Sequence, residues 1–370
     1  MNTGFGLEKA VREARAKTGV PGVAAGLLRD GETVFAADGV LELGRNEAVR
    51  PETPFRIASI TKPFTATLCA ASIGLDERLP ALLSHTAGLR CESAQPLPQE
   101  AIGLWSYSNA GYWEAAAACG GPFDAAMATH VLEPLDLAAT GFAEPESPAR
   151  GHVQEGESGH RAVSVDSYPA ARWPSGGLWS TAGDLLRFAA HHLDGAPPEL
   201  HEPRGNALGA QYALGWWVRE HADGTTTLDH EGSVAGYQSL LLLVPAESLA
   251  LAVLTNSWRG SGLVRRVVDS LGLLPPPVGA VAAPDDIVGT YELDGTEASV
   301  ERTGDGVVVS EAETDPVTGT RRSTRFPARP MGDGVYGFAH GTLMSHRLDF
   351  PRPGLARIGW VVLPRVERRA

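Results

Sequence analysis

Hydrophobic residues recur along the chain with two spacings, one helical and one strand-like. Near the N-terminus, apolar residues fall at helical intervals within a charged segment, which predicts a helix over residues 7–18. Two apolar runs follow, at residues 22–28 and 33–37, separated by Asp30-Gly31. An Asp-Gly pair between such runs is typical of a β-hairpin, because the central residues of its tight turn need positive φ.

The same kinds of pattern continue to residue 271. Further helices are predicted over residues 59–71, 109–119, 123–132, 181–192 and 263–271. Further strands are predicted over residues 53–57, 211–219, 226–229, 237–244 and 249–255. Asn109 and Thr181 are expected to cap the helices that start beside them. We expect an α/β fold in which the N-terminal and C-terminal strands of this region share one antiparallel sheet, with helices inserted between them.

The pattern changes after residue 274. Residues 275–285 are rich in proline, which predicts a linker. Residues 286–370 contain short alternating runs separated by Gly and Asp, which predicts a small antiparallel β-domain of the barrel type. The expected division is therefore a larger domain over residues 1–274, the linker, and this smaller domain.

Composition narrows the class of partner and site. The chain has 370 residues, of which 43% are hydrophobic and 20% charged, as in an ordinary globular protein. Its net charge of −13 argues against nucleic acid or an anionic membrane as a partner. Three cysteines form no disulfide framework, and no His, Cys and Asp cluster has the spacing of a zinc site. We expect no metal and no cofactor.

Two segments bear on location. Residues 1–19 lack the apolar core and cleavage pattern of a signal peptide. The most apolar stretch, Leu240 to Leu254, is interrupted by Pro245 and Glu247, so it is read as two strands rather than a membrane span. A cytoplasmic protein is expected.

The candidate chemistry starts at Ser59 and Lys62. The chain contains 28 Arg but only three Lys, and Lys can lose its proton on burial whereas Arg effectively cannot. A spacing of three places both side chains on one helix face, where an amine could activate the weakly nucleophilic hydroxyl. Pro63 is tolerated only in the first turn, so the helix should begin at or just before Ser59, at its positive end.

Two further motifs follow in order, Tyr107-Ser108-Asn109 and His230-Glu231-Gly232. Each short motif alone is weak, because chance produces it at an appreciable rate. Longer segments around them add specificity: residues 55–62, 82–89, 107–112, 134–135, 175–178, 180–185, 214–216 and 230–233. In these segments the chain resembles the serine β-lactamase and penicillin-binding protein family, in the branch of class C β-lactamases, D-aminopeptidases and esterases. The resemblance implies a catalytic domain whose sheet is flanked by helices and a helical subdomain.

The resemblance also implies roles. Ser59 would be the nucleophile, and Lys62 with Tyr107 would accept its proton and pass it to the leaving group. Asn109 would hold Lys62 and hydrogen-bond the substrate. His230 would complete the polar network over the cleft.

Two more positions are implied to serve the substrate directly. Gly232 would let a substrate backbone lie close to its strand, because a Cβ there would obstruct it. The backbone N–H groups of Ser59 and Ser233 would form the oxyanion hole.

Other notable residues have simpler interpretations. His85 is expected in a structural turn, and the adjacent His191 and His192 on the surface. Aromatic residues that flank the motifs are as compatible with core packing as with an acyl pocket: Trp105, Trp173, Trp179 and Tyr237.

The chain departs from the family in one respect. Only 44 residues separate Lys62 from Tyr107, fewer than in relatives, so the helical subdomain should be shortened and the cleft open on that side. The smaller domain opens with residues 288–291, which resemble the lipocalin-like domains of some D-aminopeptidase and peptide-cyclising relatives. A roof over the cleft and a stabilising appendage are both compatible with that resemblance.

The leading hypothesis is a serine hydrolase that acts through an acyl-enzyme on an ester or a small or D-amino peptide amide. The first alternative is a transacylase or peptide cyclase of natural-product biosynthesis, which passes the acyl group to an amine or alcohol. A β-lactamase is a second alternative, disfavoured by the missing export signal. A catalytically silent binding module should have lost a motif residue, yet all are intact. The expected partner is a small-molecule or peptide acyl substrate, and the oligomeric state is left open.

Overall fold

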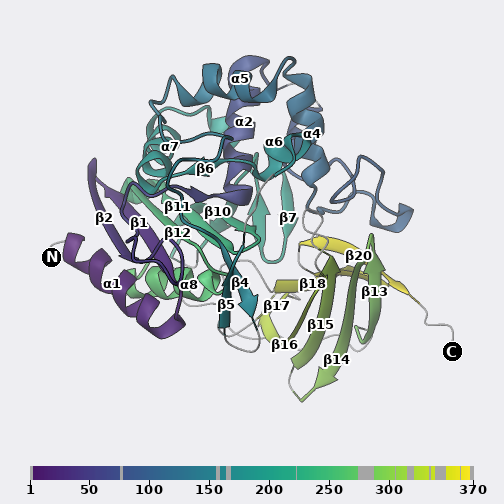
Figure 1. The fold of residues 1–370 in the computed structure, drawn as a ribbon. Coiled ribbons are helices and arrows are strands. Elements are labelled where there is room, and N and C mark those ends of the chain that lie inside the picture. The colour runs from purple at the N-terminus through teal and green to yellow at the C-terminus, as the bar shows by residue number, and fades with distance from the viewer. Residues whose placement is uncertain are drawn as a thin grey trace.

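A computed structural model of the chain describes residues 3–75, 78–155, 159–163, 168–221, 223–273, 287–304, 306–314, 321–332, 335–337, 347–358 and 360–366. Figure 1 shows two parts, a sheet covered by helices and a β-barrel formed by the C-terminal strands. The expected fold class is confirmed, including the single antiparallel sheet built from both ends of the larger part.

The larger sheet has eight strands in the described part of the chain, in the order β2-β1-β12-β11-β10-β9-β8-β7. Their bounds are β1 Gly22–Arg29, β2 Glu32–Gly39, β7 Gly205–Ala207, β8 Ala210–Tyr212, β9 Trp217–Glu220, β10 Thr226–Val234, β11 Tyr237–Val244 and β12 Leu249–Thr255. Two small sheets pair β3 (Phe55–Arg56) with β6 (Trp179–Ser180) and β4 (His152–Glu155) with β5 (Gly159–Ala162). Asp30 and Gly31 both have positive φ, as the predicted hairpin requires.

Helices cover both faces of this sheet (Figure 1). The α-helices are α1 Thr3–Thr18, α2 Thr61–Ser72, α3 Leu79–Leu83, α4 Asn109–Ala118, α5 Phe123–Met127, α6 Trp173–Gly176, α7 Ala182–Asp194 and α8 Gly260–Leu271. Shorter turns are η1 Ala58–Ile60, η2 Gln99–Ala101, η4 Ala170–Arg172, η5 Pro198–Leu200 and η6 Pro245–Glu247, and a π-helical segment η3, Ala128–Leu132, continues α5. Helices α1 and α8 pack on one face, and α2 and α7 on the other.

The central strands are apolar on both sides because both faces are covered. Along β12, Leu249, Leu251 and Val253 pack toward α1 and α8. The alternate residues of the same strand, Ala250 and Leu254 among them, pack toward α2 and α7. The interrupted apolar stretch is therefore two central strands, as predicted. Among the described residues, no helix is long and apolar enough to cross a membrane.

Three local predictions are corrected. Ser59 lies in the 3₁₀ turn η1, and α2 begins at Thr61, with Pro63 in its first turn as expected. Ser108, not Asn109, caps α4, because its hydroxyl accepts the N–H of Gly111 at 3.0 Å. The strand predicted over 211–219 is interrupted at Gly215, whose φ is +87° and where a Cβ would lie 2.9 Å from Pro63 Cα.

The two adjacent histidines differ in environment. His192 is buried rather than on the surface, because α7 turns it toward α2, where its Nε2 lies 3.1 Å from Thr67 Oγ1. Its Nδ1 lies 2.9 Å from His201 Nε2. The prediction of a surface position is therefore wrong for His192, while His191 remains part-exposed.

The C-terminal strands close into a barrel. They are β13 Gly289–Leu293, β14 Thr296–Thr303, β15 Gly306–Thr314, β16 Arg321–Gly332, β17 Val335–Gly337, β18 Arg347–Arg352, β19 Leu355–Ile358 and β20 Val361–Val366. Alternating residues fill its interior, among them Val300, Val309 and Phe326. The predicted linker at 275–285 lies outside the described residues, so the domain boundaries stay a prediction.

Candidate active site

The nucleophile lies in a tight turn between β3 and α2. Ala58, the residue before Ser59, has φ +47°, a conformation that non-glycine residues adopt at a cost. The turn is held from the sheet side, since Ser239 Oγ donates to Ile57 O at 3.1 Å. Ser59 itself is half-buried, so its hydroxyl faces the site while its backbone is fixed.

Four of the predicted residues meet around this hydroxyl. Lys62 Nζ lies 3.2 Å from Ser59 Oγ, and Tyr107 O–H donates to the same oxygen at 3.0 Å. Asn109 Oδ1 accepts from Lys62 Nζ at 2.8 Å. The structure thus brings together Ser59 and Lys62 from one helix start, and Tyr107 and Asn109 from another.

The surroundings of Lys62 determine where its lone pair points. Its Nζ contacts two oxygens that can only accept, Asn109 Oδ1 and the backbone carbonyl of Ser175, at 2.8 and 2.7 Å. In the neutral amine, these two carbonyls take both N–H groups. The remaining position of the nitrogen, which holds the lone pair, then faces Ser59 Oγ.

Burial favours that neutral amine. Lys62 is fully buried, and desolvation lowers its pKa from 10.5 to about 7; Arg172 lowers it further, whereas Cys91 and Glu92 raise it. The rings of Tyr107 and Tyr112 lie 4.7 and 5.3 Å from Nζ. A base whose pKa lies near neutrality is suited to proton transfer at the pH of a cell.

Tyr107 stays protonated. Burial raises its phenol pKa well above 10, although the hydrogen bond to Ser59 opposes the shift. Its ring packs 4.3 Å from the ring of His85. His85 is buried, its backbone has a φ of +62°, and its Nδ1 accepts the N–H of Ser108 at 3.0 Å. His85 is therefore in a structural turn, as predicted, directly beneath Tyr107.

His230 lies on β10 and is buried. Its side chain is fully buried, and its Nδ1 is 2.7 Å from the carbonyl of Glu231, which can only accept, so Nδ1 carries the proton. The other nitrogen then accepts from Tyr212 O–H at 3.1 Å. Burial, helped by Lys62, lowers the pKa of His230 to about 3, so the ring is neutral. His230 supports Tyr212 and does not carry a charge.

Gly232 has a physical role other than the predicted one. A Cβ at this position would lie 2.1 Å from the carbonyl oxygen of Ile57 and 2.3 Å from Ser239 Oγ. The place that a Cβ would take is filled by the turn before Ser59, while a role of Gly232 toward substrate stays a prediction. Its neighbour Ser233 is exposed, and its hydroxyl accepts from Gln238 at 2.8 Å.

The sequence reasoning missed a charged group beside Asn109. Glu92 Oε1 accepts from Asn109 Nδ2 at 2.6 Å, and its other oxygen accepts from Arg172. The guanidinium of Arg172 lies 4.9 Å from the ring of Trp113. No local signal marks either residue, because neither lies in a motif and 80 positions separate them.

The flanking aromatic residues are mostly core. Trp105, Trp179 and Tyr237 are buried, whereas Trp173 is half-buried and stacks on Phe142 at 4.7 Å. Another aromatic residue, Trp360, reaches the site from the barrel.

The turn between β19 and β20 contacts the segment that holds Tyr107. The carbonyl of Trp360 accepts the N–H of Tyr107 at 2.9 Å, and the two rings lie 5.3 Å apart. Val362 N–H donates to Ser106 Oγ at 3.1 Å, and Arg357 donates to the carbonyl of Trp105 at the same distance. The barrel therefore covers part of the side on which an open cleft was expected; the width of the cleft stays a prediction.

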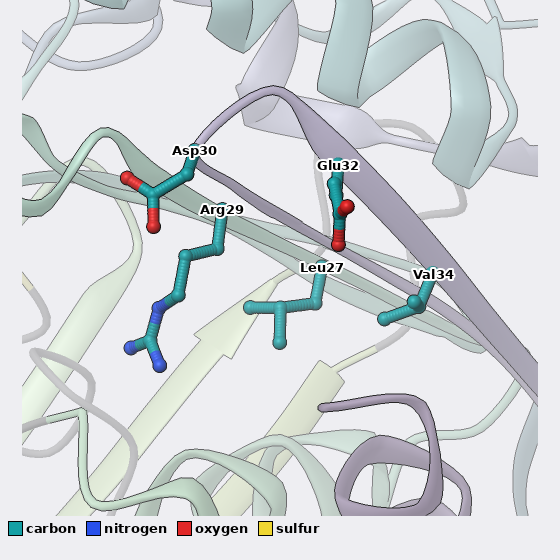
Figure 2. Close-up of a pocket in the computed structure, with 5 residues that line it drawn as sticks. All are labelled: Leu27, Arg29, Asp30, Glu32 and Val34. Atoms are coloured by element: carbon teal, nitrogen blue, oxygen red, sulfur yellow. The ribbon is translucent and has the colours of Figure 1, made fainter. Parts of the chain in front are cut away.

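Two surface depressions lie elsewhere, at the β1–β2 hairpin. Figure 2 shows the first, of about 300 Å³, lined by Leu27, Arg29, Asp30, Glu32 and Val34. The second, of about 530 Å³, lies on the α7 side of the same hairpin. Neither contains a residue of the Ser59 site. In the described part of the chain, no group of three or more His, Cys, Asp or Glu is placed to hold a metal.

Comparisons with known proteins found similar sequences and folds. A model of the Beta-lactamase family matches residues 7–74 and 78–271. Penicillin-binding protein 4 of Amycolatopsis lactamdurans is 28% identical over 368 residues, which cover 76% of this chain and 95% of that relative. The crystal structure of SurE matches with a TM-score of 0.71 at 24% identity, over 97% of this chain and 98% of that one. The D-amino acid amidase of Ochrobactrum anthropi SV3, complexed with L-phenylalanine amide, has a TM-score of 0.62 at 21% identity, over 74% of this chain and 99% of that one.

Proposed function

This chain belongs to the beta-lactamase family and is an enzyme of the serine-hydrolase type, and from that premise we propose that it cleaves an ester or a small or D-amino peptide amide through an acyl-enzyme on Ser59. The observation that carries the proposal is the pair of carbonyl acceptors on Lys62, which leaves the lone pair of the amine facing Ser59 Oγ.

The proposed acylation needs protein groups alone. Lys62 takes the proton of Ser59 Oγ as that oxygen attacks the acyl carbon, while Tyr107 O–H stabilises the developing charge. The N–H groups of Ser59 and Ser233 hold the oxyanion. As the intermediate collapses, the proton passes through the Lys62 and Tyr107 pair to the departing alcohol or amine. In hydrolysis, water repeats the sequence, which releases the acid and restores Ser59.

The D-amino preference rests on likeness to other proteins. One solved relative is described as a D-amino acid amidase, and SurE has been solved with D-Leu. By this likeness, we propose that the substrate of this chain is a small-molecule or peptide acyl donor. Its negative net charge gives no support for nucleic acid as a partner. The cytoplasmic location stays a prediction.

Acyl transfer to an amine or alcohol is the second candidate, and one observation favours it. Trp360 packs on Tyr107 and covers the site from the barrel side, which restricts the approach of water to an acyl-enzyme. β-Lactamase activity uses the same residues and remains the third candidate.

The test is the intact mass of the protein over time after mixing with an activated D-amino acyl ester, for wild type and Ser59→Ala. We expect an adduct on wild type only, which clears in water. An adduct that persists until an amine or alcohol is added would favour transfer. An adduct with penicillin but not with the ester, which clears in water as the opened penicillin is released, would favour β-lactamase activity. An equal adduct on Ser59→Ala would contradict Ser59 as the nucleophile.

A further inference from the structure

The side-chain amide of Asn109 lies between the amine of Lys62 and the carboxylate of Glu92. Its Oδ1 is 2.8 Å from Lys62 Nζ, and its Nδ2 is 2.6 Å from Glu92 Oε1. A carboxylate can only accept, so Glu92 determines which end of the amide is the NH₂ group. The carbonyl end is thereby turned toward Lys62.

Glu92 is held in turn by Arg172. The guanidinium donates to the second carboxylate oxygen, and the pair is largely shielded, with 32% of the Glu92 side chain and 16% of the Arg172 side chain exposed. The hydroxyl of Ser175 donates to the carbonyl of Arg172 at 3.1 Å and accepts from Trp113 Nε1 at 2.9 Å. The same cluster therefore also positions Ser175, whose carbonyl is the second acceptor on Lys62.

We propose that Glu92 and Arg172 are positioning residues for acylation: by holding Nδ2 of Asn109, Glu92 directs the lone pair of Lys62 at Ser59. This inference rests on the proposed function. If the amide were reversed, Nδ2 would donate to the lone pair of neutral Lys62, and the amine would no longer face Ser59 as a base. One N–H of Asn109 Nδ2 is thereby engaged by Glu92, and Nδ2 also lies 3.9 Å from Cys91 Sγ.

The two residues also act on Lys62 through charge, in opposite directions. Glu92 raises the pKa of Lys62, and Arg172 lowers it. The titratable and charged groups that face Lys62 are His85, Cys91, Glu92, Tyr107, Tyr112, Arg172 and His230. Of these, the two histidines have lowered pKa values, and those of Cys91, Tyr107 and Tyr112 are raised, so burial keeps these five groups neutral at pH 7.

The experiment measures the rate of acyl-enzyme formation from an activated acyl ester between pH 5 and 9. Glu92→Gln should lower the plateau rate roughly tenfold or more, because the glutamine amide no longer distinguishes the two ends of Asn109. It should also move the rise in rate to lower pH. Arg172→Gln should lower the plateau less than Glu92→Gln does, because Arg172 acts only by holding Glu92 and Ser175, and it should move the rise to higher pH. Glu114→Gln makes the same charge change on α4 at a part-exposed surface pair with Arg78, and should change neither.

A double variant tests the orientation directly. In the double variant Glu92→Gln with Asn109→Asp, the glutamine NH₂ can donate to one aspartate oxygen while the other aspartate oxygen accepts from Lys62. The hydrogen bond between positions 92 and 109 is then restored with donor and acceptor exchanged, and the total charge is kept. The double variant should be faster than the product of the two single effects by at least about fivefold.

The outcomes separate the two proposals. If wild type forms no acyl-enzyme, the proposed function fails and this inference with it. If wild type reacts but the two single charge variants shift the pH profile in the same direction, or the double variant shows no coupling, the positioning role is wrong while the acyl-enzyme stands. Thermal melts accompany each variant. Should Glu92→Gln not fold, the double variant is compared with Asn109→Asp alone and should acylate faster, while Arg172→Gln should still move the rise in rate to higher pH; the opposite results would contradict the positioning role.

Discussion

At the scale of single residues, the site depends on an amine that the fold keeps away from water. Lys62 is fully buried among two carbonyl oxygens and two phenol rings, and desolvation is the largest cause of its lowered pKa. The same burial that makes Lys62 a usable base also makes its charged form costly to the folded protein. Two predictions follow at this scale.

The first concerns the pH dependence of activity. Because the pKa of Lys62 is about 7, the base form increases as pH rises through neutrality. The rate of acyl-enzyme formation should rise with pH and level off above about pH 8. A rapid-mixing measurement with an activated ester checks this. A rate that falls as pH rises from 6 to 8 would contradict Lys62 as the base.

The second concerns stability. The pKa of Lys62 is lowered in the folded protein, so the unfolded chain binds the proton more tightly, and folding loses stability as pH falls toward 7. Lys62→Met removes that penalty while filling a similar volume. It should abolish acylation yet raise the free energy of unfolding at pH 6 by roughly 2 kcal/mol, after the lost hydrogen bonds are allowed for. Urea unfolding at pH 6 and pH 10 measures it, and the gain should shrink at the higher pH.

Sequence reasoning identified the reacting residues but not their supports. Ser59, Lys62, Tyr107 and Asn109 lie in motifs with fixed spacing, and the structure brings them together. Glu92 acts through a contact that no periodicity encodes, since it depends on how the loop before α4 is folded. The complete burial of His230 could not be inferred from its strand position, because that position alone does not tell which parts of the chain cover each face.

At the scale of elements, the decisive contact is between the turn η1 and the strand β10. The carbonyl of Ile57 occupies the place where Gly232 lacks a side chain, and Ser239 donates to that carbonyl. The strained Ala58 is held by these neighbours. The nucleophile is thereby positioned by the sheet as well as by its own helix.

This contact predicts a strong effect at Gly232. Gly232→Ala would place a Cβ 2.1 Å from Ile57 O, which forces the turn away from the strand. We expect a loss of roughly 2–3 kcal/mol in the free energy of unfolding, together with slow acylation. Gly183→Ala is the matched control, because its Cβ would meet nothing closer than 3.8 Å within α7, and it should be neutral or stabilising. Equal stability of the two variants would show that β10 can move enough to admit the added Cβ, which would contradict this prediction.

The hydrophobic pattern predicted most elements. Because both faces of the sheet are covered, residues 240–244 of β11 and 249–254 of β12 form continuous apolar runs. The pattern failed where tertiary contacts set the geometry. The break at Gly215 reflects the approach of Pro63, and the choice of Ser108 over Asn109 as the cap leaves Asn109 for Lys62. Neither contact could be inferred from residues next to each other in the chain.

At the scale of the whole molecule, the barrel is part of the site's framework. It binds the β7–β8 turn through Asp349, which accepts the N–H of Leu208 at 3.1 Å, and through Arg347, which donates to the carbonyl of the same residue. It binds the segment around Tyr107 through Trp360 and Val362. Figure 1 shows the barrel below α4 and α6.

A prediction at this scale tests whether the barrel positions Tyr107 or only stabilises the protein. Trp360→Ala removes the ring that packs on Tyr107 but keeps the backbone hydrogen bond. Acyl-enzyme formation should slow roughly tenfold, and Trp360→Phe should restore most of it. Trp258→Ala, a half-buried tryptophan of the larger part that lies 4.8 Å from Arg259, serves as the control. Equal rates for Trp360→Ala and wild type would favour a barrel that only stabilises.

The hydrogen bond between Tyr107 and Trp360 has a consequence for when, during translation, the enzyme becomes active. A ribosome delivers Ser59 and Lys62 early and Trp360 much later, so the nascent chain contains a nucleophile and its base before the backbone of Tyr107 has its partner. The ability to form the acyl-enzyme on Ser59 should therefore appear late in translation. A product that stops before the β19–β20 turn would carry every motif residue and still lack the contact that fixes Tyr107.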